Sequence, residues 1–175
     1  LPLSVDNYVP YAFNDYYNIG EQGVFADYVV IMGYDEHYAG SQEAGSVASI
    51  EYVTDGITHT IAKVPRQKVV NALPFYARIW WTRPSGVTSE AHGMADIAAF
   101  IANHGMSVSW DAKTAQNYAE TTEGDTLIQI WIEDAQSIRE KLNVMKANEI
   151  GGVAEWRLQF ETPDIWDEIA NYMNS

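Results

Sequence analysis

Apolar residues in the first part of the chain fall either in short unbroken runs or at helical spacing. Residues 27–32 read DYVVIM, a β-branched run without a polar break, which predicts a strand buried on both faces of a parallel sheet. Ser46 or Ser49 would cap a following helix, and Pro65 would end it. The apolar positions of that helix lie mostly three or four residues apart, at Val47, Ile50, Val53, Ile57, Ile61 and Val64.

The same alternation of apolar runs and helical patterns continues to the end of the chain. Residues 68–73, KVVNAL, predict a second strand, and strand, helix and strand within such a length form a parallel, right-handed βαβ unit. Leu1–Val5 and residues 151–156, GGVAEW, predict two further strands. Helices are expected at residues 133–149 and 163–173. Strands that alternate with helices indicate the α/β class.

Residues 84–132 interrupt this alternation. A helical pattern at residues 94–103 is followed by SVSWD, QNYAET and TLIQIWI, which turn residues separate. Short strands with close connections predict a small antiparallel α+β insertion. The expected organisation is therefore a main body of residues 1–83 and 133–175 with an insertion subdomain at 84–132.

Composition narrows the function classes. The chain has 175 residues and a formal charge of −14, from 10 basic and 24 acidic residues, which argues against nucleic acid and against anionic membrane surfaces. Neutral or cationic partners are compatible with this charge, and sugar polymers fit well. No apolar stretch approaches the roughly 20 residues of a membrane-spanning helix, and no signal peptide is visible. The absence of cysteine excludes disulfides and thiolate chemistry.

A dense polar cluster follows the run at 27–32. Tyr34, Asp35, Glu36 and His37 come directly after Gly33. Polar groups at the carboxyl end of a parallel strand usually face a ligand crevice, so the cluster is a candidate site. The alternative is the start of a loop with a buried tyrosine hydroxyl. Consecutive Asp, Glu and His side chains cannot all face one ion from a regular backbone, so we expect no metal and no cofactor.

Four motifs resemble glycoside hydrolase family 18. They are MGYDEH after one strand, FYAR after the next, WIEDAQSIREKL leading into a helix, and GGVAEWRLQFE at the last strand. The loop YDEHYAGS is similar to the YDEHW-x-G-S loop of the bacterial cell-wall and spore-cortex lytic members, with Tyr38 in place of Trp. Each motif is weak by itself, but their order and spacing extend over nearly the whole chain.

The resemblance implies the C-terminal half of a (β/α)8 TIM barrel. Strands five to eight would be those at Leu1–Val5, 27–32, 68–73 and 151–156, with the insertion between strands seven and eight. The family's acid motif, Asp-x-x-Asp-x-Asp-x-Glu, is not in the sequence, and the chain opens on Leu1 rather than Met. We therefore expect a processed or truncated chain that is inactive alone, since a general acid contributes roughly 10²–10⁴-fold.

The resemblance also implies a mechanism and its catalytic residues. Family 18 hydrolysis is substrate-assisted and retaining: the 2-acetamido group of the sugar attacks its own anomeric carbon. The hydroxyl of Tyr34 would bind the acetamido carbonyl, and Asp35 would orient the sugar. Trp156 would form the aromatic floor under the sugar, and Met32 would line the pocket from below.

Further substrate contacts follow from the same resemblance. Tyr76, Arg78 and Trp80 come after the predicted seventh strand and would contact sugars on the product side. Trp80 and Trp81 could equally pack under the insertion. Glu133, at the exit of the insertion, matches a family pattern and is a candidate substrate contact.

The expected substrate is a polysaccharide containing N-acetylglucosamine, with peptidoglycan favoured over chitin, and the resemblance implies an extracellular, cell-envelope or spore location. A non-catalytic carbohydrate-binding module that uses Tyr34 and Trp156 is the alternative function. A third expectation concerns assembly: a half-barrel leaves two sheet edges open, so it should pair with the missing N-terminal half-barrel, self-associate, or be only marginally stable by itself.

Overall fold

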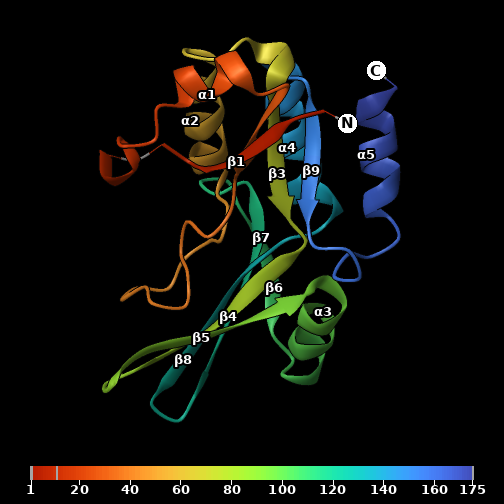
Figure 1. Ribbon diagram of the computed structural model, residues 1–175. Helices are drawn as coiled ribbons and strands as arrows, with labels where there is room; N and C mark the ends of the chain where they lie inside the picture. Colours follow the sequence, from red (N-terminus) through yellow and green to blue (C-terminus); the bar gives the residue numbers. More distant parts are fainter. Residues whose placement is uncertain (1, 11, 175) are drawn as a thin grey trace.

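The computed structural model describes residues 2–10 and 12–174 and contains two sheets (Figure 1). The first sheet is parallel, with strand order β1-β2-β3-β9. Its strands are β1 (Ser4–Tyr8), β2 (Tyr28–Met32), β3 (Val69–Pro74) and β9 (Gly152–Trp156). The α/β class is confirmed. Leu1, predicted to open the first strand, lies outside the described residues, and that strand continues beyond the predicted end at Val5.

One face of this sheet forms the main core. Val29 and Ile31 are fully buried, whereas Val30 and Met32, which point to the other face, are only half-buried. The prediction of a strand buried on both faces is therefore wrong for β2. The helices cover one side alone, and no described residue covers the other side as fully.

The helices that cover the sheet have clear start signals. Ser49, one of the two predicted caps, accepts a hydrogen bond from the backbone N–H of Tyr52, and Asp134 forms a capping box with Ser137. In Figure 1, α2 and α4 lie behind the strands and α5 lies beside α4. The helices are α1 (Ile19–Phe25), α2 (Ile50–Ile61), α4 (Ala135–Ala147) and α5 (Ile165–Met173), with short 3-10 turns η1 (Ala12–Asn14) and η2 (Arg66–Lys68).

The second sheet lies between β3 and β9 in the sequence. It is antiparallel, with order β5-β4-β8-β7-β6, and it packs with α3 around a small core of its own. Its elements are β4 (Tyr76–Arg83), β5 (Gly86–Gly93), α3 (Met94–Asn103), β6 (Ser107–Asp111), β7 (Gln116–Glu123) and β8 (Thr126–Ile132).

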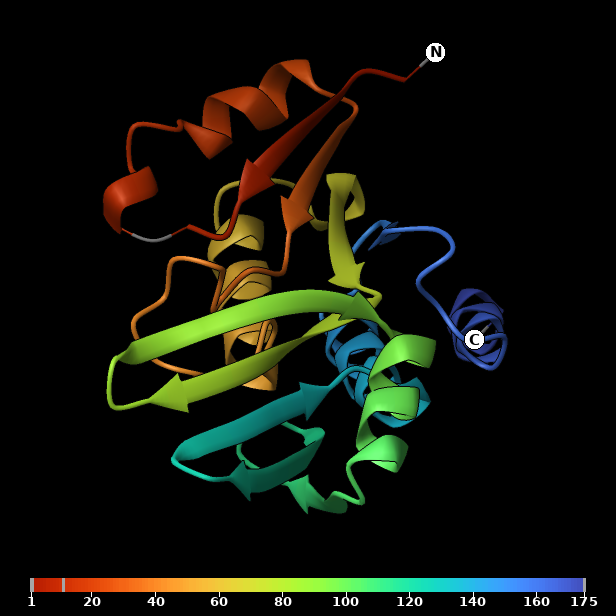
Figure 2. The same cartoon turned by 90° about the horizontal axis from the view of Figure 1, so that it is seen from below.

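The predicted insertion boundary at residue 84 is too late. Residues 76–83 do not extend the strand at 68–73, because β4 pairs with β5 and β8 and so belongs to the second sheet. Phe75, fully buried, separates β3 from β4. A single apolar run thus crosses from one sheet to the other, and the hydrophobic pattern alone gives no sign of the break. Figure 2 shows the β4–β5 hairpin crossing below the parallel strands.

The arrangement brings the second sheet to the carboxyl edge of the first. In Figure 1 the arrowheads of β3 and β9 point towards β4 and its neighbours. No helix in the described part of the chain is both long and apolar enough to cross a membrane.

Candidate active site

Strand register places two predicted site residues on the same face of the parallel sheet. Met32 is level with Ala72, and Ala72 is level with Ala154. Trp156 follows Ala154 by two positions and therefore points to the same side, one level nearer the carboxyl edge. Trp156 is 54% exposed and Met32 is half-buried. The peptide bond between Trp156 and Arg157 is cis.

Asp35 and Tyr76 are joined at this edge. The Tyr76 hydroxyl donates a 2.5 Å hydrogen bond to Oδ1 of Asp35, and Asp35 is exposed with a positive φ of 61°. A positive φ is uncommon for residues other than glycine, and it turns the chain out of the line of β2. Burial, and then the hydrogen bond to Asp35, raise the pKa of Tyr76, so this phenol stays protonated and acts as a donor.

Tyr34 lies against the same pair. Its ring meets the Tyr76 ring edge to face, with 6.3 Å between centroids, and its backbone carbonyl accepts a hydrogen bond from the Tyr52 hydroxyl. Burial, and then the negative charge of Asp35, raise the pKa of Tyr34. Tyr34 therefore presents a neutral hydroxyl beside a carboxylate.

A cavity of about 490 Å³ opens next to this group. Aromatic rings dominate its lining, with one pair of adjacent carboxylates. Aromatic faces with a few fixed polar groups are the usual lining of a small-molecule site. The lining residues are Tyr8, Val9, Asn14, Tyr34, Asp35, Glu36, Tyr38 and Tyr52.

Tyr8 and Tyr52 were not among the predicted site residues. Tyr8 ends β1, at the position where strand ends supply ligand contacts. The predicted first strand stopped at Val5, so Tyr8 was not recognised as a residue at a strand end. Tyr52 lies in the first turn of α2 and was not among the apolar positions that predicted this helix.

Trp80 and Glu133 are not available to a substrate in this structure. Trp80 is 1% exposed, and its ring meets the His37 ring edge to face at 6.4 Å between centroids. Glu133 is also 1% exposed and forms a 3.0 Å ion pair with Lys141. Burial raises the pKa of Glu133, and the charge of Lys141 opposes that shift. Trp80 therefore packs in the interior and Glu133 forms a buried ion pair, and neither is exposed for substrate contact.

Arg78 is half-buried on β4. Its Nη1 donates to Ser89 Oγ of the neighbouring strand at 3.1 Å, and its Nε is buried without a hydrogen-bond partner. The guanidinium is thus directed along the second sheet. The proposed product-side contact stays a prediction for Arg78. Within residues 2–10 and 12–174, no three His, Asp or Glu side chains gather closely enough to hold a metal ion.

Comparison with known proteins gives consistent matches over the whole chain. Residues 3–161 match the family described as "Glycosyl hydrolases family 18". The cortical fragment-lytic enzyme of Bacillus subtilis (strain 168) is 26% identical over 168 residues, which are 94% of this chain and 38% of that protein. The chain spans less than half the length of the curated relatives it matches.

Two solved structures share the fold. A chitinase from Chromobacterium violaceum ATCC 12472 superposes with a TM-score of 0.88 at 26% identity, covering 100% of this chain and 56% of that chain. The Bacillus cereus spore cortex-lytic enzyme SleL superposes with a TM-score of 0.87 at 22% identity, covering 98% of this chain and 41% of that chain.

Proposed function

The chain belongs to the glycosyl hydrolases of family 18, and on that premise we propose that it forms the substrate-stabilising half of a glycosidase active site. The substrate class is a glycan containing N-acetylglucosamine, and peptidoglycan is favoured over chitin because the matched relatives include cortical fragment-lytic enzymes. The single observation that carries this proposal is the Tyr76–Asp35 hydrogen bond beside Tyr34, at the carboxyl edge above Met32. A spore or cell-envelope location follows from the same relatives.

The proposed mechanism is substrate-assisted and retaining. The acetamido carbonyl oxygen attacks the anomeric carbon while the glycosidic oxygen leaves with a proton from a general acid. The Tyr34 hydroxyl donates to the acetamido group and holds it in place. Asp35, fixed by Tyr76, places negative charge near the positive charge that develops on the ring being formed. Removing one such preorganised group costs about 3–4 kcal/mol of transition-state stabilisation.

Trp156 completes the proposed site as a platform. It is the most exposed tryptophan at the carboxyl edge, and register puts it on the face that Met32 shares. Indole faces stack on the apolar faces of sugar rings and exclude water from one side. The sugar at the point of cleavage would lie on Trp156 with its acetamido group turned towards Tyr34.

We propose that β1, β2, β3 and β9 correspond to strands five to eight of a (β/α)8 barrel. The superposition on about half of a solved chitinase supports this assignment. β1 and β9 are the edges of the parallel sheet, and large apolar side chains are exposed beside β1, at Leu3, Tyr8, Val24, Phe25 and Tyr28. Strands that carry the acid motif would pair with these edges, whether they come from a preceding half-barrel or from another chain.

Hydrolysis by the full-length protein tests the proposal. Purified cortex peptidoglycan and N-acetylglucosamine oligomers are incubated with the protein, and products are followed by mass spectrometry, with the anomer assigned by NMR. We expect cleavage with retention, lost in Asp35→Asn and Tyr34→Phe. Binding to either glycan without cleavage, in a protein that carries the acid motif, would instead establish the carbohydrate-binding module, which the exposed Trp156 also favours.

A further inference from the structure

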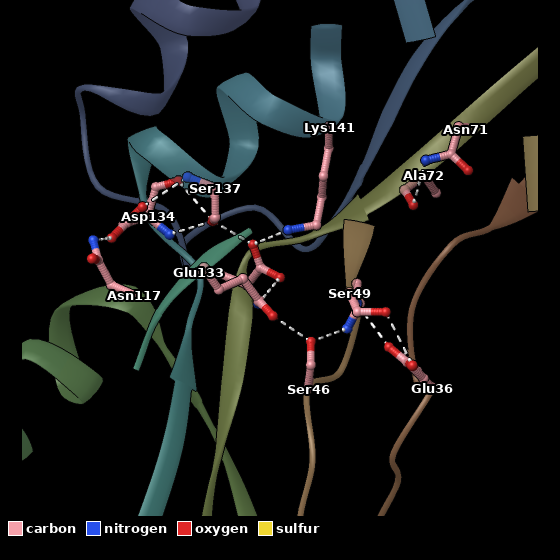
Figure 3. A network of polar contacts seen from close by, with 12 residues as sticks. Glu36, Ser46, Ser49, Asn71, Ala72, Asn117, Glu133, Asp134, Ser137 and Lys141 are labelled. Carbon is pink, nitrogen blue, oxygen red and sulfur yellow. Dashed lines mark hydrogen bonds and ion pairs between the residues drawn. The ribbon is translucent and has the colours of Figure 1, made fainter. Parts of the chain in front are cut away.

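A set of buried polar side chains connects the loop after β2 with helix α4. We call this set the relay; all its members are buried, and no carboxylate, amide or hydroxyl in it faces solvent. They come from three separate parts of the chain: the loop between β2 and α2 (residues 33–49, the site loop), the start of β7, and residues 133–141, which extend from the end of β8 into the middle of α4. Figure 3 shows Glu133 between Lys141 and Ser137 of α4 on one side and Ser46 on the other. The members are Ser46, Gln116, Glu133, Ser137 and Lys141.

The donor and the acceptor of each hydrogen bond in the relay are fixed by the chemistry of its side chains. Glu133 accepts at Oε2 from Lys141 Nζ at 3.0 Å and from Ser137 Oγ at 2.7 Å, and at Oε1 from Gln116 Nε2 at 2.8 Å. A carboxylate only accepts, so the amide nitrogen of Gln116 must face Glu133. The amide oxygen of Gln116 then faces Ser46, whose Oγ donates to it at 2.5 Å.

Ser46, which is bonded to Gln116, also makes hydrogen bonds within the site loop. Its Oγ accepts from the N–H of Ala48 at 3.0 Å, and its backbone carbonyl accepts from His37 N at 3.2 Å and lies 2.8 Å from His37 Nδ1. A carbonyl oxygen only accepts, so Nδ1 of His37 carries a proton. Glu36 N also donates to the carbonyl of Val47 at 2.9 Å. Residues 36–37 are thus paired with residues 46–47.

Glu36 and His37 come directly after Tyr34 and Asp35. The hydrogen bonds that hold Glu36 and His37 therefore also position the two proposed catalytic residues. Asp35 is exposed and its backbone lies in the left-handed region, which is unfavourable for a residue other than glycine, so neighbouring segments must hold it there. Its partner Tyr76 belongs to β4, in the sheet that also carries Gln116 on β7. The relay therefore fixes the site loop relative to the sheet that supplies the Asp35 partner.

We propose that Gln116 is a positioning residue for Tyr34 and Asp35, acting through Ser46. This inference rests on the proposed function for its catalytic consequence. It also makes a claim about loop geometry that stands alone: removal of the Gln116 amide changes the backbone environment of Asp35. Small displacements of a catalytic group cost up to about 10²-fold in rate, which makes the loop position a sensitive quantity.

The test compares Gln116→Met and Ser46→Ala with Ile130→Ala in the full chain. Met has nearly the shape of Gln but neither donates nor accepts through an amide. Ile130 is a fully buried core residue of β8 outside the relay, so its truncation controls for lost stability. The two probes are tri-N-acetylchitotriose, which reports on general sugar binding, and the thiazoline analogue of N-acetylglucosamine, which reports on the geometry around the acetamido group.

We expect the two relay variants to bind the thiazoline roughly ten- to a hundredfold more weakly, with the affinity for chitotriose changed much less. The double variant should lose no more than either single variant, because both remove the same connection. Ile130→Ala should shift neither affinity although it lowers the unfolding midpoint. Equal losses for both probes, or the same losses in Ile130→Ala, would overturn the proposal.

A second measurement separates this inference from the proposed function. Amide ¹H–¹⁵N shifts of Tyr34, Asp35 and Glu36 should move in Gln116→Met and Ser46→Ala but not in Ile130→Ala. If the wild-type chain binds neither probe while these shifts move, the function is wrong and the positioning role stands. If the shifts stay unchanged, Gln116 only stabilises the fold, whatever the chain binds.

Discussion

The hydroxyl of Tyr76 lies 2.5 Å from Oδ1 of Asp35 and donates a hydrogen bond to it. Tyr76 opens β4, the first strand of the second sheet, and Asp35 follows β2 of the parallel sheet. The two sheets therefore meet in the candidate site through this tyrosine–carboxylate contact, with the Tyr34–Tyr76 ring contact beside it. Tyr76 is buried although Asp35 is exposed, so the contact is partly shielded from water and stronger than the same pair would be on the surface.

Tyr76→Phe removes this donor and leaves the rings in place. A hydrogen bond to a charged group is worth about 1.5–3 kcal/mol, so we expect kcat of the full-length protein to fall by roughly ten- to a hundredfold, with a smaller change in KM. Rates are measured on a fluorogenic N-acetylglucosamine oligomer. Tyr118→Phe is the matched control, because Tyr118 donates a 2.5 Å hydrogen bond to Glu120 away from the site. A similar loss in both variants would contradict a special role for Tyr76.

Lys141→Met should be strongly destabilising. It leaves the buried Glu133 carboxylate without its cation, and breaking a buried ion pair from one side costs about 3–5 kcal/mol. The added substitution Glu133→Gln should recover part of that loss. The free energy of unfolding is measured in urea. Arg66→Met, which breaks the exposed pair with Glu149, should cost no more than about 1 kcal/mol; a cost for Lys141→Met as small as that would contradict this account.

Glu155→Gln should stabilise the chain at neutral pH. Burial, and then the charge of Glu161, raise the pKa of Glu155. A carboxyl whose folded pKa is raised favours the folded state below its unfolded pKa, about 4.3, and that contribution is lost as pH rises through the folded pKa. Thermal unfolding should therefore show a higher Tm for the variant at pH 7 and little difference near pH 3.5. A constant difference at both pH values would exclude titration as the cause.

Gly151→Ala should destabilise the junction between α4 and β9. A Cβ at this position would lie 2.2 Å from the backbone carbonyl oxygen of Gln67, and backbone atoms cannot move aside as a side-chain end can. Such crowding costs about 1–3 kcal/mol. The neighbouring Gly152→Ala is the control, since its Cβ would meet nothing closer than the Val70 side chain at 3.9 Å. The midpoints of chemical denaturation are measured for both variants. Equal midpoints would contradict the predicted crowding at Gly151.

The sequence predicted the two central strands well because their buried residues form apolar runs: 27–32 and 68–73 became β2 and β3, with ends shifted by a residue or so. Residues 151–156 became β9 with a similar shift, although β9 is an edge strand without fully buried residues. The first strand was misplaced because β1 is an edge strand with exposed residues at Asp6 and Tyr8, so it has no apolar run to read.

The candidate site was only partly visible in the sequence. The rule that polar groups at strand ends face a ligand pointed to Tyr34 and Asp35, whereas Trp156 was proposed only from the resemblance to family 18. Trp80 and Glu133 were misread because their burial depends on contacts with residues far away in the chain, His37 for one and Lys141 with Gln116 for the other. Local periodicity carries no information on such partners, and only the packed structure reveals them.

The position of the second sheet within the chain also bears on how the protein folds. β3 and β9 are neighbours, with Val70 opposite Gly152, yet the whole antiparallel sheet lies between them in sequence. Contacts between such distant residues close a large loop and form slowly, whereas the hairpins β4–β5 and β7–β8 are local and form fast. We therefore expect the antiparallel hairpins to gain protection from hydrogen exchange first, and the carboxyl edge that holds Trp156 to be completed last.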